Sequence, residues 1–442
     1  MRRLIYIFII GLLLCSYTWA DGSRYASKSL LSEGKWVKIR VDKTGIYKLS
    51  YADLKNMGFS DPSKVSVHGY GGWPLDEDFS KEYIDDVPST PVWRGSDYLL
   101  FYGKGSVKWE YDSSSQTFVH TNNPYCLYGY YFVTDATPTN DMTSVAQASG
   151  ASTRITTYDD YLLHEQELVS VNQSGREFFG EDFSGARPRT ISTFSSIPGI
   201  TDADGKVTMR FISRINSGSG TASLSINDSE LLDITIPSIQ TVSSNVRSYT
   251  KAIPGTTTAL WKGSKSEKNN VVVSYSSSGH TNVRLDYIRM QFVRTLRPYG
   301  ACTFFRSLTS VGNASRFVIS EANSNTLVFD VTDALNVKRV EADLNGSELS
   351  FTIPAGRLRE FVLVQTNQTF PSPEVVGEVA SSNLHGLEQR DMIIISAPSL
   401  VQQAERLAVA HREKDGLTVE VVTPEAIYNE FSSGTPDATA YR

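Results

Sequence analysis

The chain lacks several patterns on which common enzyme chemistry depends. None of its histidines has a partner at the His-x-x-x-His spacing that zinc sites use, so we propose no zinc site. A Gly-x-Ser-x-Gly motif is also missing, which excludes the nucleophile elbow of a serine hydrolase. The six histidines stand at positions 68, 120, 164, 280, 385 and 411.

The chain has no basic stretch. Its 42 Lys and Arg residues are outnumbered by 48 Asp and Glu residues, which gives a formal net charge of -6. Loss of Arg2 and Arg3 with the first 20 residues would bring the charge to -8, from 40 basic and 48 acidic residues. Because nucleic-acid binding depends on clustered positive charge, we expect no nucleic-acid partner.

Long apolar runs are missing except near the N-terminus. Residues 4–14 are apolar and follow a basic start, and the small residue Ala20 comes shortly after them. This pattern predicts a signal peptide at residues 1–20, cleaved after Ala20, and hence export. The run is shorter than the roughly 20 residues that span a bilayer. Lipid attachment at Cys15 is a less favoured alternative, because Leu14 precedes it where a small residue is wanted.

Cysteine is scarce. After cleavage only Cys126 and Cys302 remain, and the sequence leaves open whether they pair or stay as two partly buried thiols. No cysteine follows Cys302, which weakens a catalytic interpretation of His385-Gly386. Cysteine peptidases with a caspase-like fold hold their general base in such a step, but after a later strand and with a cysteine nucleophile nearby. We therefore expect His385 to be a structural residue of a linker.

Three further groups of residues invite a functional interpretation, and each has a simpler one. Gly69-Tyr-Gly-Gly72 follows a predicted strand, but neither a helix start nor a Lys-Ser/Thr pair follows, which predicts a tight loop. Asp202-Ala-Asp204-Gly205 resembles half of a calcium loop without its terminal glutamate, and a hairpin turn is preferred. His164-Glu165 beside Glu167 suggests acid–base chemistry, although a solvated surface cluster is commoner. We assign no catalytic, cofactor-binding or metal-binding residue.

What the chain does contain is a β-rich pattern with many aromatic residues, 22 Tyr and 20 Phe. Residues 36–41 alternate as a strand does, and residues 65–68 and 97–102 are further short apolar runs. Residues 50–57 predict a two-turn helix that Ser50 caps and the following glycine ends. The aromatic residues between 109 and 132 suggest a sugar-binding platform or, more simply, the interior of a β core.

The middle of the chain repeats short alternating strands. Residues 135–157 are rich in Ser, Thr, Ala and Gly, which predicts an exposed linker. Residues 158–370 then predict an antiparallel sandwich or jelly roll, since turn-like clusters separate the strands and no helix intervenes. The clearest strands are expected at 207–213, 222–226, 271–275, 283–288, 327–331 and 349–353.

The last fifty residues change character. Residues 391–396 and 417–422 predict two strands, and the apolar spacing between them predicts a helix that Gly416 ends. Thr423-Pro424 then predicts the start of another helix. The pattern is the first βαβα unit of an α/β domain, and we expect this domain to be incomplete, because such sheets need more than two strands.

These segments resemble a known family. They are similar to the start of the gingipain catalytic domain, cysteine peptidase family C25, and more narrowly to the sortases of the type IX secretion system in Bacteroidetes. The stretches that carry the resemblance at the C-terminal end are 383–387, 391–395, 404–408, 411–417 and 427–440. Upstream stretches that resemble the same proteins are 36–49, 65–72, 174–181 and 285–288.

The resemblance implies a protein at the outer-membrane surface that cleaves C-terminal sorting domains from secreted cargo. It implies cargo proteins and other outer-membrane secretion components as partners, and a lipopolysaccharide anchor as the final acceptor of the cargo. The nucleophilic cysteine and the histidine base of the family match no position of this chain, so no catalytic residue is carried over. We therefore expect an N-terminal part of such a peptidase, inactive by itself.

The expected organisation is mainly β: two β-rich domains followed by an incomplete caspase/gingipain-like α/β domain. The opposing hypothesis is a secreted, non-enzymatic β-rich surface protein for adhesion or glycan binding. It has to explain the unburied apolar strand faces of an unfinished α/β unit. The expected segments are residues 1–20 (signal peptide), 21–140 (first β-rich domain), 158–370 (second), 371–390 (linker) and 391–442 (start of the α/β domain).

Overall fold

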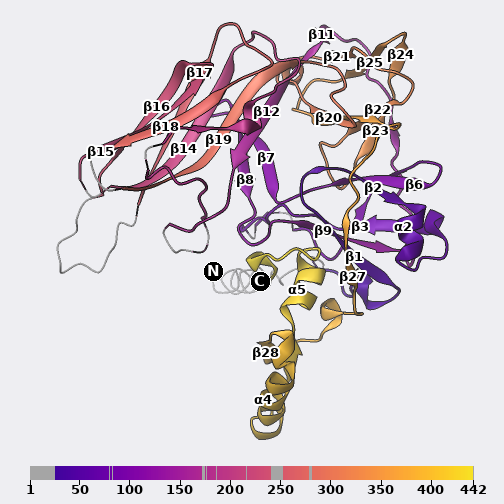
Figure 1. The fold of residues 1–442 in the computed structure, drawn as a ribbon. Helices are drawn as coiled ribbons and strands as arrows, with labels where there is room; N and C mark the ends of the chain where they lie inside the picture. The colour runs from indigo at the N-terminus through magenta and orange to yellow at the C-terminus, as the bar shows by residue number, and fades with distance from the viewer. Residues whose placement is uncertain are drawn as a thin grey trace, which may run out of the picture.

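The computed structural model describes residues 25–441 except 79, 82, 172–174, 176, 186, 216, 240–251 and 278–280. The expected signal peptide with Cys15 lies outside the described residues, as does His280. Figure 1 shows three β-rich bodies and a narrow C-terminal extension, which confirms the mainly β class. Within the described part of the chain, no helix has the length and apolar character needed to cross a membrane.

The first domain is a two-sheet sandwich. One sheet has the strand order β27-β1-β9-β3-β4 and the other β2-β6-β5, and their facing side chains, such as Ile39 and Phe101, are fully buried. The strands are β1 (Trp36–Val41), β2 (Gly45–Ser50), β3 (Ser66–His68), β4 (Ser89–Thr90), β5 (Val92–Arg94), β6 (Tyr98–Gly103), β9 (Gly129–Thr134) and β27 (Glu374–Glu378). Two short 3-10 turns, η1 (Leu30–Ser32) and η2 (Pro62–Lys64), accompany them.

Helix α2 (Tyr51–Asn56) closes one side of this domain. The Ser50 hydroxyl accepts the N–H of Asp53, and the Asp53 carboxylate accepts the N–H of Ser50. Gly58 follows with φ +91°, a conformation that favours glycine, and Leu54 is fully buried. The helix predicted from its cap and its terminal glycine is therefore confirmed.

A hairpin of β7 (Val107–Asp112) and β8 (Thr117–Asn122) extends from the first domain to the second. The Trp109 ring stacks on Tyr161 with centroids 3.9 Å apart. The Phe118 N–H donates to the side-chain oxygen of Gln291 at 2.9 Å. The aromatic residues of this region thus pack mostly inside and between domains, as the simpler interpretation predicts, although Tyr125 is 43% exposed.

The second domain is a sandwich of two four-stranded sheets, β12-β19-β14-β17 and β13-β18-β15-β16. Burial alternates along β15, as expected for a strand with one face on a core. A separate hydrophobic core lies between the sheets. The elements are β12 (Thr157–Glu165), β13 (Arg189–Thr190), η3 (Ser192–Phe194), β14 (Gly205–Ile215), β15 (Ser219–Ile226), β16 (Ser229–Pro237), β17 (Ile253–Trp261), β18 (Val271–Ser277) and β19 (Thr281–Thr295).

The third domain is another two-sheet sandwich, with the orders β10-β23-β22-β26-β20 and β11-β21-β25-β24. Its core centres on a cluster of rings that includes Phe305, Phe317 and Phe361. The elements are β10 (Ser144–Val145), β11 (Thr153–Ile155), β20 (Cys302–Phe305), α3 (Thr309–Gly312), β21 (Ser315–Ile319), β22 (Thr326–Asp330), β23 (Lys338–Val340), β24 (Asp343–Asn345), β25 (Glu348–Ile353) and β26 (Phe361–Gln365).

The structure therefore divides residues 158–370 differently from the prediction, with two cores in place of one. The short alternating strands continue without a compositional break where one sandwich ends and the next begins, so the sequence carries no boundary signal. The two expected linkers also differ from the prediction. Residues 135–157 contain β10 and β11, which pair in parallel with β23 and β21, and residues 371–390 contain β27, which pairs with β1.

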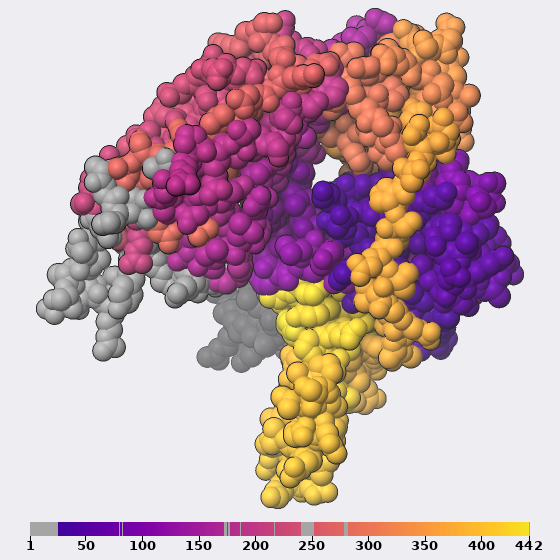
Figure 2. Space-filling view, viewed as in Figure 1, coloured from indigo at the N-terminus to yellow at the C-terminus, as the bar shows by residue number. Residues whose placement is uncertain are grey.

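The C-terminal extension confirms the predicted βαβα unit. Strands β28 (Met392–Ile395) and β29 (Val419–Val422) pair in parallel, and α4 (Val401–Lys414) connects them. The side chain of Thr423 caps α5 (Pro424–Phe431), as predicted. Figures 1 and 2 show the β28–α4 end projecting away from the three domains while α5 lies against them. Short 3-10 turns complete the extension: η4 (Leu384–Gly386), η5 (Pro398–Leu400) and η6 (Ala438–Tyr441).

Candidate functional site

His385 is the centre of a buried polar cluster between the C-terminal extension and the first domain. Its side chain is only 1% exposed, and its ring stacks on Phe431. Nδ1 lies 2.7 Å from a carboxylate oxygen of Glu430, and Nε2 lies 2.7 Å from a carboxylate oxygen of Asp85. Both ring nitrogens therefore donate to carboxylates, which requires the charged imidazolium.

The electrostatics of this cluster follow from its hydrogen bonds. Burial opposes the charged ring of His385, but the bonds to Asp85 and Glu430 outweigh it and raise the pKa of His385 to about 9. Burial likewise opposes the charged form of Glu430. Hydrogen bonds from the His385 ring, the Leu384 N–H and the Ser382 hydroxyl outweigh this effect and lower the pKa of Glu430.

Neighbouring residues form further hydrogen bonds between the C-terminal extension and the first domain. Lys38 on β1 donates to the side-chain oxygen of Asn429 on α5 at 2.9 Å, and burial lowers the pKa of Lys38 to about 8. We call the five residues Asp85, His385, Glu430, Lys38 and Asn429 the clasp. Further hydrogen bonds join the C-terminal extension to the first domain beside it, among them Tyr83 to the Phe431 carbonyl, Thr435 to the Gly71 carbonyl, and the Leu75 N–H to Asp437.

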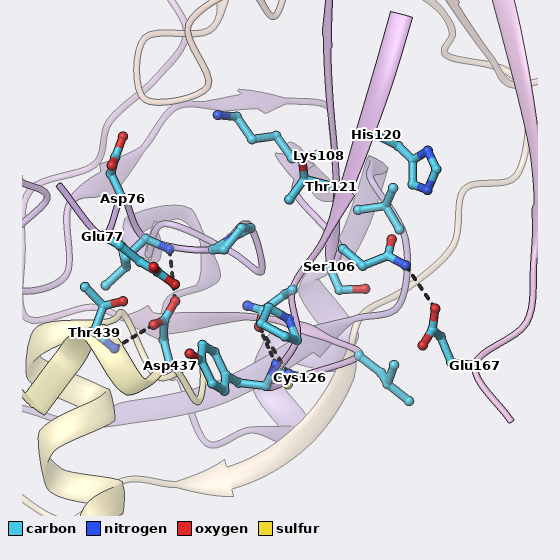
Figure 3. A pocket seen from close by; sticks show the side chains of 18 of the residues that line it. Asp76, Glu77, Ser106, Lys108, His120, Thr121, Cys126, Glu167, Asp437 and Thr439 are labelled. Atoms are coloured by element: carbon cyan, nitrogen blue, oxygen red, sulfur yellow. Dashed lines mark hydrogen bonds between the residues drawn. The ribbon is translucent and has the colours of Figure 1, made fainter. Parts of the chain in front are cut away.

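A cleft of about 1370 Å³ lies next to the clasp. Its walls come from the β7–β8 hairpin and nearby loops of the first domain, from β12, β14 and β19 of the second, and from Asp437 and Thr439 of the C-terminal extension. In Figure 3, Glu167 and Asp437 lie on opposite sides of this space. The cleft therefore lies where three parts of the chain meet, which is where binding sites commonly form.

Of the group His164, Glu165 and Glu167, the first two are enclosed and not solvated as the sequence favours, whereas Glu167 is exposed and lines the cleft. His164 is bonded to Thr193 and to Glu181, on the side opposite the cleft. Glu165 lies 3.2 Å from Nε2 of His120, and both side chains are at least nine-tenths buried. Alternation along β12 separates His164 from Glu165, and pairing with β19 encloses both, which the local sequence does not show.

The pKa values of two carboxyl groups in the cleft are raised. Burial, together with the negative charges of Glu165 and Asp286, raises the pKa of Glu167 to about 7. The Glu167 carboxylate accepts a hydrogen bond from Asn122 at 3.2 Å. Burial also raises the pKa of Asp286 to about 6, even though its ion pair with Arg210 opposes this. Near neutral pH the cleft therefore contains carboxyl groups that a cation would stabilise in the charged form.

The remaining predicted positions have structural environments. Gly69-Tyr-Gly-Gly72 forms the predicted tight loop, in which a Cβ at Gly71 would lie 2.9 Å from the Lys104 carbonyl oxygen. Asp202 accepts the N–H of Lys265 in a loop before β14, so the expected hairpin turn at this place is wrong. Among the described residues, no group of three or more His, Cys, Asp or Glu side chains could hold a metal ion.

The two cysteines do not pair. Cys126 lines the cleft, and Cys302 on β20 packs beside the interface of the third and first domains. Burial raises the pKa of the Cys302 thiol to about 12, which leaves it unreactive at neutral pH. The alternative of two partly buried free thiols is therefore the one that the structure shows.

Comparison with known proteins agrees with the geometry of the C-terminal extension. The model of peptidase family C25 matches residues 385–442 and so begins at the clasp histidine. The crystal structure of dimeric latent PorU from Porphyromonas gingivalis is 36% identical to this chain, with a TM-score of 0.85 over 95% of it. The chain belongs with the PorU-like proteins of peptidase family C25.

The PorU-like chain spans 40% of the length of that PorU structure. The insecticidal δ-endotoxin Cry8Ea1 from Bacillus thuringiensis also matches, at 10% identity over 51% of this chain and 41% of that chain, with a TM-score of 0.21. A CBM35 from Cellvibrio japonicus matches 31% of this chain and 97% of its own length at 14% identity, with a TM-score of 0.16. Scores this low support no argument. A search of curated proteins found no match.

Proposed function

We propose that the chain is the β-rich N-terminal part of a sortase-like cysteine peptidase of the type IX secretion system. Such a peptidase removes C-terminal sorting domains from secreted cargo at the outer-membrane surface, together with other secretion components, and passes the cargo to a lipopolysaccharide anchor. The observation that supports this most is the likeness to PorU, at 36% identity over 95% of the chain.

The contribution of this chain is to hold the beginning of the C25 domain in place. Helix α5 ends at the clasp, where a fully buried glutamate, Glu430, meets a charged histidine and is tied through it to the first domain. Such a network fixes orientation, because any displacement leaves buried charges without partners. The three β-rich domains thereby act as a platform. The clasp residues position the beginning of the C25 domain and do not themselves cleave a peptide bond.

The proposal is tested by disrupting the gene in its source organism and measuring the masses of secreted proteins. The expected result is cargo that keeps its sorting domain, and normal cargo masses after the intact gene is restored. Normal masses in the disrupted strain would overturn the proposal. If that strain instead lost attachment to a glycan surface, the adhesion hypothesis would be favoured.

A further inference from the structure

The cleft beside the clasp has the size and shape to accept a segment of polypeptide. Its volume of about 1370 Å³ exceeds the roughly 300–1,000 Å³ that is typical of small-molecule sites. Figure 3 shows side chains from well-separated parts of the first domain and from the C-terminal extension around one space. An extended chain of several residues is therefore a better fit for this space than a single small molecule.

The cleft carries an excess of negative charge. Eight of its lining residues are Asp or Glu, and three are Lys or Arg. All three basic side chains already form ion pairs with acids of the cleft: Lys81 with Asp76, Lys108 with Glu110, and Arg210 with Asp286. Among the other acids, Glu165 lies beside His120 and Glu177 also contacts Arg210. The cleft still has five more acidic than basic side chains, and this excess favours a ligand that brings its own positive charge.

Buried polar atoms on β8 give an independent indication of a missing partner. The side chain of His120 is 5% exposed, and its Nδ1 has no hydrogen-bond partner among the described residues. The side-chain oxygen of Asn122, two residues along the same strand, is also buried without one. Both residues line the cleft, and both atoms can accept an N–H donor. Backbone amides and ammonium groups of a bound chain supply such donors.

The rim of the cleft is apolar. Tyr125, Leu127 and Phe178 line it and are 43%, 64% and 36% exposed. Large exposed apolar side chains around a polar floor are typical of surfaces that bind another chain. A ligand that matches both features carries basic and apolar residues together.

We propose that the cleft binds an extended segment of secreted cargo in which lysine or arginine residues stand next to apolar ones. This inference rests on the proposed function for the source of the segment. Asp437 and Thr439 of the C25-matched extension form part of the wall, so the bound segment lies beside the beginning of the peptidase domain. The basic side chains face Glu167 and Glu177, and the apolar ones face Leu127 and Phe178.

The first experiment measures direct binding. A short fluorescent peptide of alternating lysine and leucine is titrated against the protein, and its anisotropy is followed at low and moderate salt. The double variant Glu167→Gln, Glu177→Gln is expected to bind about tenfold more weakly, with a smaller salt dependence. The double variant Glu230→Gln, Glu341→Gln changes the net charge equally at exposed positions of the second and third domains that do not line the cleft, and it is expected to bind normally.

A peptide of alternating glutamate and leucine is expected not to bind. Equal binding of the two peptides, or equal binding by the two double variants, would overturn the inference. These outcomes do not depend on whether cargo is processed, so they leave the proposed function untouched.

The second experiment identifies the source of the segment. A photoreactive residue in place of Leu127 is introduced into the protein in cells that secrete one tagged cargo protein. A cross-link to that cargo, lost in the Glu167→Gln, Glu177→Gln background, is the expected result. A cross-link to a second copy of this protein, or none to the cargo, would overturn the assignment to cargo. Unchanged cargo processing after gene disruption would instead count against the proposed function.

Discussion

The clasp and the cleft lie side by side and shift the pKa values of their acids in opposite directions. In the clasp, Glu430 is fully enclosed, yet its pKa is lowered because several donors surround it. In the cleft, Glu167 is more accessible, yet its pKa is raised because burial and two negative neighbours act together. Burial alone therefore does not decide the charge of an acid; the supply of donors does. The charged groups of the clasp have partners within the chain, whereas Nδ1 of His120 and the side-chain oxygen of Asn122 in the cleft have none among the described residues.

The largest test of this contrast is to remove the central donor of the clasp. We expect His385→Asn to lower the free energy of unfolding at the clasp by about 3–5 kcal/mol, since two buried carboxylates lose their shared cation. Hydrogen exchange of α5 amides measures this locally. His411→Asn is the matched control, because His411 pairs with Asp415 on the exposed end of α4. Equal protection of α5 in both variants would contradict the structural role of His385.

The pH dependence of the clasp is the next largest effect. The pKa of His385 in the folded protein, about 9, is above its ordinary value of 6.5. The stability that it contributes is therefore fully present below pH 6.5 and is lost as pH rises through 9, by about 3 kcal/mol at most. The ring nitrogen signals of His385 in NMR report this titration directly. A midpoint near 6.5 would mean that the two carboxylates do not hold the ring charged.

A smaller effect is expected within the cleft at the ion pair between Asp286 and Arg210. Asp286 is 4% exposed and pairs with Arg210, which also contacts Glu177. Arg210→Gln should destabilise the second domain by about 1–3 kcal/mol, because the buried Asp286 carboxylate loses its ion-pair partner. Denaturant unfolding of the variant measures the change. Asp233→Asn, on the exposed face of β16, is the control and should be close to neutral.

The smallest effect is expected at Glu167. Glu167→Gln should change stability by less than about 0.5 kcal/mol, since the side chain is accessible and its bond to Asn122 is long, at 3.2 Å. The raised pKa means that the contribution of Glu167 is present below pH 4.5 and is lost as pH rises through about 7. Carboxyl NMR should show a titration near 7 that is absent in the variant. Its persistence would assign that titration to another acid.

Local signals in the sequence predict local structure well. Ser50 and Gly58 predict the limits of α2, and Thr423-Pro424 predicts the start of α5, because caps depend on neighbouring residues. The parallel pairing of β28 and β29 also follows from a strand–helix–strand pattern. The family resemblance of the C-terminal residues agrees with the match of residues 385–442 to peptidase family C25 and with the likeness of the chain to PorU.

Long-range contacts are what the sequence does not reveal. The sequence predicts a structural role for His385, but nothing near it indicates Asp85, which lies 300 residues away. The cleft is likewise assembled from three separate parts of the chain, so no motif marks it. The acids around His164 wrongly predict a solvated environment for this side chain. It is enclosed because β12 pairs with β19, more than a hundred residues further along the chain. Turn-like composition similarly hides β10, β11 and β27, which join sheets formed elsewhere in the chain.

The pairing of β27 with β1 has a consequence for the order in which the molecule assembles. Val37 lies opposite Glu378, so the sheet that contains the earliest strand is completed by one of the latest. A chain that emerges from its N-terminus must synthesise both later sandwiches before this sheet can acquire its edge. Until then β1 presents an unpaired edge, which is the feature that promotes association between unfolded chains. The first domain therefore stays open to such association until residue 378 is available.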